Sequence, residues 1–287
     1  MEFGVFTSRG KAFENILKSD LFQVRVLPGA KLERITSTLC DLIEDYELVW
    51  KQLNHVHPTI AYVGAGIPDI TTKLQSNGWM GRYQEVIMGP WEEEDYIRLE
   101  ADYRYSDRLL RSKGVVPVFA TIPPMDIKNW NLHRNARPTN PWRRRATDYL
   151  MYESEYEQMQ YRQVEVITRM NHYIRNLNWE NGVLDLDLAK FVMIPREGCS
   201  RRESRYRVNT GRGKLSDGCH ASPSLARQWS TYAFQTASNN RRSLSSPEAL
   251  RIMDLPSTEY DLVGVPLSQS RLRLRYDIAM ANRHSRH

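Results

Sequence analysis

Two patterns of apolar and polar positions take turns along this chain. Short apolar runs rich in β-branched residues, closed by Gly, Pro or small polar residues, predict buried strands. Longer segments with apolar residues at helical spacing predict helices. The predicted strands cover 2–8, 22–30, 60–63, 115–124 and 182–188. The predicted helices cover 9–20, 30–49, 92–114, 152–178 and a segment from 223 through 229. A short helix is expected to begin near Asp69, and a polar loop is expected over 125–147.

Strand and helix alternate about five times, which favours a parallel sheet with helices on both faces. We therefore predict the α/β class, as a three-layer α/β/α sandwich with a mainly parallel, flavodoxin-like sheet of about five strands. The domain is expected over 1–239, with basic insertion loops at about 126–148 and 195–214. Residues 240–287 mix Ser, Pro and Arg with short apolar pieces and are expected to form a basic C-terminal arm.

The composition of the chain excludes some classes of protein and indicates a globular one. With 287 residues, 41% of them hydrophobic, the chain is too apolar for a disordered protein. No apolar run approaches the roughly 18 residues of a membrane-spanning helix, and the N-terminus lacks the apolar centre of a signal peptide, so we expect an intracellular protein, cytoplasmic or nuclear. Cys40, Cys199 and Cys219 lack metal-type spacing, and His55 and His57 lack a third ligand. We predict no metal site and no cofactor.

The formal net charge of +6 is spread unevenly. Arg143, Arg144 and Arg145 form one cluster, and the segment 196–214 holds seven basic residues, Arg201 and Arg202 among them, against two Glu. Eight arginines against five acids in 241–287 make a third cluster. Such clusters suit nucleic acid or an acidic protein partner. Solvated loops that only keep the protein soluble are an equally good interpretation of any one cluster.

Polar corners follow the predicted strands. They are Ser8 after the first strand, Gly29 after the second, 64–66 with Asp69 after the third, and Asp217 with His220 before the last helix. In a parallel sheet such loops meet at the carboxyl ends of the strands. A hydroxyl, an imidazole and a carboxylate suit nucleophilic acyl transfer: Ser8 would attack, His220 would take its proton and Asp217 would hold the imidazole. The backbone N–H groups of Ser8 and Gly29 would bind the oxyanion.

The order of these corners resembles the SGNH (GDSL-type) hydrolase family, whose members carry a block I serine, a block II glycine, a block III G-x-N-D and a terminal D-x-x-H. Block V is intact here as "DGCH", Asp217 to His220, and Gly29 in "VRVLPGAKL" fits block II. The similarity runs from about Phe3 to Ala233. Together with "VPVFATIPPMDIKNWN", it looks most like the divergent hydrolase-like domains encoded by retrotransposons and related mobile elements. The resemblance implies a serine esterase, of carboxylesterase or acetylesterase type, acting on a small ester or acylated substrate.

The chain departs from the family pattern at two blocks. "FTS" stands where the family has Gly-Asp-Ser, and "GIPD" stands where it has G-x-N-D, so Pro68 removes the side-chain amide that would bind the oxyanion. The alternative function is therefore a weak or inactive SGNH scaffold of a mobile element or virus, which binds nucleic acid or a protein through its Arg-rich loops. Ser8 and Asp69 also suit helix caps, and Gly29 also suits a simple turn.

Overall fold

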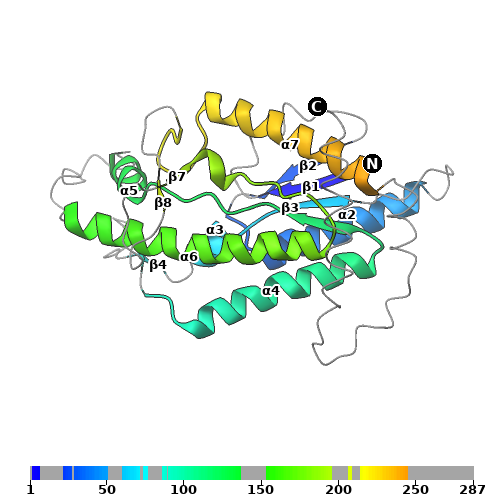
Figure 1. The fold of residues 1–287 in the computed structure, drawn as a ribbon, viewed down its shortest axis with the longest axis horizontal. Coiled ribbons are helices and arrows are strands. Elements are labelled where there is room, and N and C mark those ends of the chain that lie inside the picture. The colour runs from blue at the N-terminus through cyan, green and yellow to red at the C-terminus, as the bar shows by residue number, and fades with distance from the viewer. Residues whose placement is uncertain are drawn as a thin grey trace.

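The structure is a computed structural model that describes residues 2–6, 22–27, 29–50, 60–71, 74–76, 86–88, 90–136, 153–195, 206–208 and 214–244. A parallel sheet of four strands lies at its centre, in the order β2-β1-β3-β6 (Figure 1). Its strands are β1 (Glu2–Phe6), β2 (Phe22–Val26), β3 (Ile60–Gly64) and β6 (Val116–Phe119). Each of the four lies within or overlaps a predicted strand, so the first four of the five predicted strands are confirmed.

Helices cover both faces of this sheet, as the alternating pattern predicted. One face carries α2 (Leu32–Trp50), α4 (Glu93–Ser112) and α6 (Glu153–Glu180), whose apolar residues form one core with Ala61 and Val63 of β3. The other face carries α7 (Pro223–Leu244), which packs with the neighbouring strand positions Ile60 and Tyr62. Figure 1 shows α7 on one side of the strands and α2, α4 and α6 on the other. Because both faces of β3 are buried, its apolar run is continuous.

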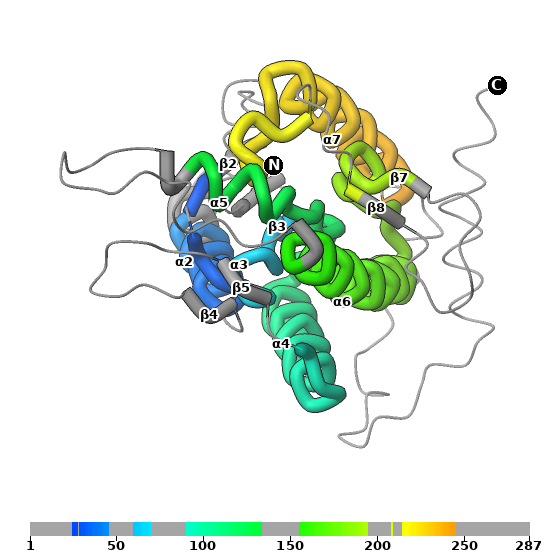
Figure 2. Tube along the Cα trace, turned by 90° about the vertical axis from the view of Figure 1, so that its left-hand side faces the viewer, coloured from blue at the N-terminus to red at the C-terminus, as the bar shows by residue number. Residues whose placement is uncertain are grey.

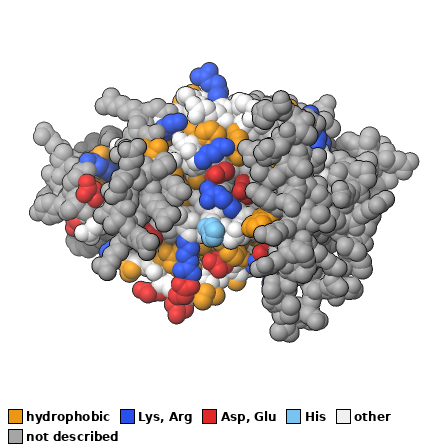
Figure 3. Space-filling view, in the orientation of Figure 1, with side chains coloured by type: hydrophobic (Ala, Val, Ile, Leu, Met, Phe, Trp, Pro, Cys, Tyr) orange, Lys and Arg blue, Asp and Glu red, His pale blue; other side chains and the backbone are white. Residues whose placement is uncertain are grey.

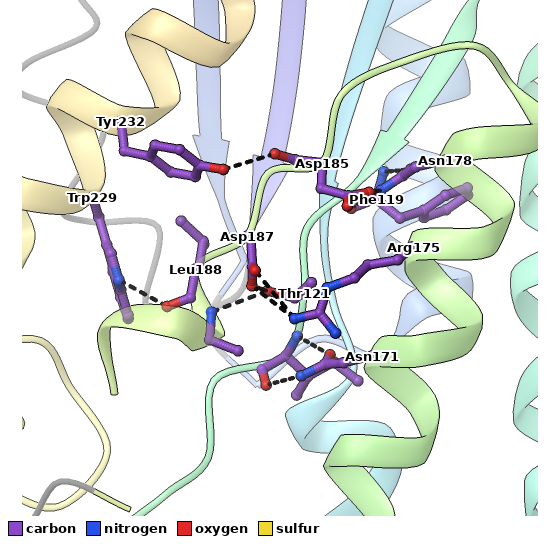
Figure 4. A network of polar contacts seen from close by, with 12 residues as sticks. Phe119, Thr121, Asn171, Arg175, Asn178, Asp185, Asp187, Leu188, Trp229 and Tyr232 are labelled. Carbon is purple, nitrogen blue, oxygen red and sulfur yellow. Dashed lines mark hydrogen bonds and ion pairs between the residues drawn. The ribbon is translucent and has the colours of Figure 1, made fainter. Parts of the chain in front are cut away.

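The fifth predicted strand, over 182–188, is not a strand in the structure. This segment makes a single parallel bridge, Ala120 with Leu186, beyond β6. The backbone groups of Phe119 that a fifth strand would use are taken by the side chain of Asn178 on α6, whose Oδ1 accepts the N–H at 2.8 Å and whose Nδ2 donates to the carbonyl oxygen at 2.7 Å. Figure 4 shows Asn178 reaching from α6 to Phe119. A carboxamide therefore replaces a backbone ladder at this position.

Other differences concern segments predicted to be loops. Within the polar loop predicted over 125–147, residues Ile127–Ala136 form helix α5, which has no amphipathic stripe and is stabilised by a cap and by packing on α6. Two short antiparallel pairs were not predicted. They are β4 (Leu74–Ser76) with β5 (Val86–Met88), and β7 (Met193–Pro195), which follows the short 3₁₀ helix Ala189–Phe191, with β8 (Tyr206–Val208).

The ends of two other elements differ from the sequence prediction. Helix α3 (Ile67–Thr71) begins before Asp69, with Pro68 in its first turn, where a missing N–H is tolerated. Helix α7 continues to Leu244, so residues 240–244 of the predicted arm are its last turn. The predicted helix over 9–20 and the rest of the arm lie outside the described residues. No helix in the described part of the chain is long and apolar enough to span a bilayer.

Candidate functional site

The carboxyl ends of β2 and β3 bring two of the predicted corners, the one with Gly29 and the one at 64–66, to the same end of the sheet. Phe6, the last residue of β1, is in register with Val26 of β2 and with Gly64 of β3. The chain therefore leaves β1 between the corner that holds Gly29 and the corner at 64–66. In Figure 2, which views the molecule from the left of Figure 1, α5 appears between the segment before α7 and α3. Ser8 follows Phe6 by two positions and lies outside the described residues.

Asp217 and His220 form a hydrogen-bonded pair in the segment before α7. His220 Nδ1 lies 2.6 Å from Asp217 Oδ2, while Asp217 Oδ1 accepts the backbone N–H groups of Cys219 and His220 at 2.9 and 2.7 Å. Burial works to raise the pKa of Asp217, but these bonds hold it below its ordinary value. Asp217 is therefore a carboxylate at neutral pH. Nδ1 carries the proton and donates it, which leaves Nε2 as the accepting nitrogen of the neutral ring.

The two side chains differ in exposure as a general base and its orienting acid should. The Asp217 side chain is 13% exposed, whereas that of His220 is 39% exposed. The carboxylate is thus shielded from water and the imidazole remains accessible to another molecule. This arrangement can accept a proton at Nε2 and stabilise the resulting imidazolium.

The segment that carries the pair is closed at its base and leads directly into α7. Leu215 and Ala221 make an antiparallel bridge, and the N–H of Ser222 donates to the carbonyl oxygen of Lys214 at 2.8 Å. Ser222 then caps α7, because its Oγ accepts the N–H of Leu225 at 3.2 Å. The segment 214–222, which we call the Asp–His loop, is therefore tied at both ends.

The Asp–His loop also packs against the start of α5. The N–H of Asp126 donates to the carbonyl oxygen of Gly218 at 2.7 Å. Gly218 has φ +84°, and a Cβ placed there would lie 2.4 Å from both the carbonyl oxygen of Asp126 and the backbone N of Trp130. Only glycine fits both this backbone conformation and this close approach. The ring of Trp130 lies beside the imidazole of His220, with centroids 5.8 Å apart and planes inclined by 58°.

Amide side chains on α6 hold the segment between β6 and α5 in place. The carboxamide of Gln160 accepts the N–H of Ile127 at 3.0 Å and donates to the carbonyl oxygen of Met125 at 2.7 Å, while Gln163 Oε1 accepts the N–H of Met125 at 3.0 Å. Asn171, which Figure 4 labels on α6, binds both backbone groups of Ile122 in the same way, at 2.6 and 3.0 Å. The backbone on either side of Asp126, and with it the contact to the Asp–His loop, is therefore anchored to α6.

Asp69 joins the two corners that precede α2 and α3. Its carboxylate accepts the N–H of Leu32, the first residue of α2, at 3.1 and 3.2 Å from its two oxygens, and Oδ2 accepts the N–H of Gly66 at 3.2 Å. Burial raises the pKa of Asp69, although these two N–H groups and Lys31 act in the opposite direction. Asp69 is therefore a helix cap, as one interpretation of the sequence proposed, and it accepts backbone N–H groups at the starts of both α2 and α3.

The predicted site residues fall into two groups. Gly29, Asp69, Asp217 and His220 are described, and Gly29 occupies an exposed turn with φ +69°. Outside the described residues lie Ser8, His55, His57, Arg143, Arg144, Arg145, Arg201 and Arg202. Among the described residues, no group of three or more His, Cys, Asp or Glu side chains could hold a metal ion.

Sequence reasoning did not find Trp130, Asp126 or the amide side chains of α6. The amides carried a signal, because Gln160, Asn171 and Asn178 recur at helical spacing beside the apolar stripe of α6. Buried carboxamides at such positions require partners, which the neighbouring backbone supplies. Trp130 carried no signal of its own, since its partner is distant in the chain.

The described part of the face in Figure 3 carries charges of both signs side by side. Among the described residues, ion pairs of Arg169 with Glu93 and of Arg104 with Glu180 join α6 to α4, and Arg175 with Asp187 joins α6 to the segment after it. On this face the described residues therefore do not form a continuous basic surface.

Comparisons with known proteins relate the chain to others by structure. A scan against models of protein families finds no match, and neither does a search of curated proteins. Among solved structures, a candidate acylhydrolase from Bacteroides fragilis is 14% identical, with a TM-score of 0.50 over 84% of this chain and 86% of the other. A GDSL-like lipase from Bacteroides thetaiotaomicron is 11% identical, with a TM-score of 0.46 over 82% and 85%. An acetyl xylan esterase is 15% identical, with a TM-score of 0.44 over 82% and 98%.

The likeness to the candidate acylhydrolase concerns the fold. It covers more than four fifths of both chains at a level of identity that says nothing of individual side chains. The chain therefore has an α/β fold that a solved protein shares, and its chemistry has to be argued from its own residues.

Proposed function

We propose that this protein is an SGNH-like serine esterase in which Ser8 is the nucleophile and His220, oriented by Asp217, is the general base. The proposal is carried by one observation, the 2.6 Å contact of His220 Nδ1 with Asp217, an ionised carboxylate whose side chain is only 13% exposed, beside a more exposed imidazole. The register of β1 supports the role of Ser8, because Phe6 ends between the two neighbouring corners. The shared fold with a candidate acylhydrolase agrees with this chemistry.

The reaction follows from the protonation states of the pair. Ser8 Oγ attacks the carbonyl carbon of the ester while His220 Nε2 takes its proton, and Asp217 stabilises the imidazolium that forms. The tetrahedral intermediate collapses when the alkoxide leaves and receives that proton from Nε2. A water molecule then attacks the acyl-serine in the same way, so the products are an acid and an alcohol and Ser8 is restored.

Backbone groups are the proposed donors to the oxyanion. The N–H of Gly66 is bound to Asp69, and Pro68 offers neither an N–H nor a side-chain amide, so neither residue can contribute. The N–H groups of Ser8 and Gly29 are the proposed pair. Loss of one donor slows such enzymes by about 10² to 10³. We therefore expect a slow esterase, of carboxylesterase or acetylesterase type, acting on small esters or acylated substrates.

The proposal extends to the origin and setting of the protein. The phrases "VPVFATIPPMDIKNWN" and "DGCH" support a relation to the hydrolase-like domains of retrotransposons. An intracellular location, cytoplasmic or nuclear, goes with that relation. The clusters at Arg143, Arg144 and Arg145 and at Arg201 and Arg202 are the proposed contacts for nucleic acid or an acidic protein, and they are compatible with an active site elsewhere on the chain.

The test is hydrolysis of p-nitrophenyl acetate by the purified chain. We expect turnover that is lost in Ser8→Ala and His220→Ala and falls by about 10⁴ in Asp217→Asn, where the wrong tautomer is favoured. His172→Ala, a change on the exposed side of α6, is the matched control and should keep the full rate. A fluorophosphonate should label Ser8 and leave Ser8→Ala unlabelled.

Equal rates in the unmodified chain, Ser8→Ala and His220→Ala would overturn the proposal. The alternative, an inactive scaffold, predicts instead that affinity for nucleic acid falls as salt rises and weakens when Arg143, Arg144 and Arg145 are neutralised. Absent turnover together with such binding would favour that alternative.

A further inference from the structure

We propose that Trp130 is a positioning residue for His220, an inference that rests on the proposed esterase function. Asp217 holds the imidazole at one ring atom only, since the bond joins Nδ1 to Oδ2. One such bond acts as a pivot and leaves the tilt of the ring, and so the direction of Nε2, unfixed. The Trp130 ring, 5.8 Å away and inclined by 58°, is a second contact that limits this tilt.

The backbone of Trp130 is fixed relative to the Asp–His loop. Its N–H donates to the carbonyl oxygen of Asp126 at 2.9 Å, and the N–H of Asp126 donates to Gly218. The Asp126 carboxylate caps α5, because Oδ1 accepts the N–H of Asn129 at 3.1 Å. The close approach of Gly218 to the backbone of Trp130 leaves no room for a shift between the two segments. Helix α5 and the Asp–His loop therefore form one packed unit.

This unit is anchored at a distance from the imidazole. Gln160 and Gln163 bind the backbone on both sides of Asp126, which is 4% exposed, and α6 thereby sets where the indole lies. Reacting groups must be aligned closely, and a misplacement of about 1 Å can cost about 10² in rate. A ring contact supported in this way supplies such alignment without touching the reacting atoms.

The experiment compares Trp130→Ala with Trp130→Phe in the whole chain, using p-nitrophenyl acetate. We expect kcat to fall about 10- to 100-fold in Trp130→Ala with KM nearly unchanged, and most of the rate to return in Trp130→Phe, which keeps a ring. Trp179→Ala is the control, because Trp179 is a 41% exposed tryptophan in the last turn of α6, far along that helix from Gln160. It should keep the full rate.

A second measurement does not depend on turnover. The low-field NMR signal of the His220 Nδ1 proton reports its bond to Asp217. We expect it to shift and broaden in Trp130→Ala, to remain in Trp130→Phe and Trp179→Ala, and to disappear in Asp217→Asn. An unmodified chain without esterase turnover would overturn the proposed function, and this signal would then still decide whether Trp130 orients the imidazole.

Three results would overturn the inference. A rise in KM with unchanged kcat would make Trp130 a substrate contact rather than a positioning residue. An unchanged signal and rate in a folded Trp130→Ala would show that Asp217 alone suffices. A loss in Trp130→Phe as large as in Trp130→Ala, with the melting temperature equally lowered in both, would reduce the role to general stability.

Discussion

The carboxylate of Asp69 accepts the backbone N–H of Leu32, a residue 37 positions earlier in the chain. The same carboxylate accepts the N–H of Gly66, so one side chain ties the corner before α2 to the corner before α3. Gly29, the proposed second oxyanion donor, lies in the first of these corners. The placement of that donor therefore depends on a residue of the other corner.

We predict that Asp69→Ala destabilises the protein by about 1 to 3 kcal/mol, because two N–H groups lose a shared acceptor in a partly buried place. Ester hydrolysis should fall with it, since the corner of Gly29 loses its tie. Urea denaturation and the rate with p-nitrophenyl acetate measure the two effects. Glu33→Ala, at an exposed position in the first turn of α2, is the control and should change stability by no more than about 0.5 kcal/mol.

Gly218→Ala should be among the most damaging single-methyl changes in the described chain. The new Cβ would lie 2.4 Å from two backbone atoms at the start of α5, and φ +84° is unfavourable for alanine. We expect a loss of about 2 to 4 kcal/mol, measured as the free energy of unfolding in urea. Gly29→Ala is a matched control, because it has φ +69° but nothing within 4 Å of the new methyl group. Its cost should be about 1 kcal/mol, and an equal loss in both would contradict the packing argument.

Asn178→Leu tests the carboxamide that binds Phe119. Leucine has a similar size but leaves a buried N–H and a buried carbonyl oxygen without partners. Each such group costs about 1 to 3 kcal/mol, so we expect a large fall in the urea midpoint. Asn176→Leu, two positions earlier on α6, loses only an exposed contact with His172 and should be nearly neutral. Similar midpoints in the two variants would show that the carboxamide is dispensable.

The pH dependence of stability should change in Asp185→Asn. Burial raises the pKa of Asp185 to about 6, despite the opposing hydrogen bond from Asn178. The folded state therefore holds this proton more tightly than the unfolded state, and the resulting stability, complete below about pH 4, is lost as the pH rises to about 6. Asp185→Asn should be more stable than the unmodified protein by about 1 to 3 kcal/mol at pH 7.5 and about equal to it near pH 4.

Thermal unfolding at several pH values measures this difference. Asp41→Asn, at an exposed position of α2, removes a charge of the same kind and serves as the control. A gain in Asp185→Asn that is the same at pH 4 and pH 7.5 would contradict the role of the proton.

The spacing of apolar residues was sufficient to predict an element where that element buries a regular face. The runs that became β3 and β6 and the stripes that became α2 and α4 follow from their own residues. It failed where a distant partner decides the conformation. The run at 182–188 has the composition of a strand, but Asn178 already occupies the backbone of Phe119. Helix α5 has no stripe and exists because Asp126 caps it and Gln160 and Gln163 hold its start.

The candidate site divides in the same way. Asp217 and His220 are three residues apart, so their pairing is local and could be predicted from the motif. The contact of Trp130 with His220 joins segments that are 90 positions apart in the chain. No pattern in either segment predicts that the two lie together. The need for Gly218 within the motif likewise becomes visible only when the backbone of α5 is placed against it.

The Asn178 carboxamide that binds Phe119 also affects whether folded molecules can aggregate through the edge of the sheet. On the outward side of β6, Pro117 has no N–H, Asn181 approaches its carbonyl oxygen, and Asn178 binds both backbone groups of Phe119; just beyond the strand, Leu186 accepts the N–H of Thr121. Edge strands whose backbone groups are unpaired can pair with strands of other chains, and such pairing leads to aggregation. Here side chains of helix α6 bind the backbone groups of the edge strand β6. A strand of another chain therefore cannot pair with this edge, although no fifth strand covers it.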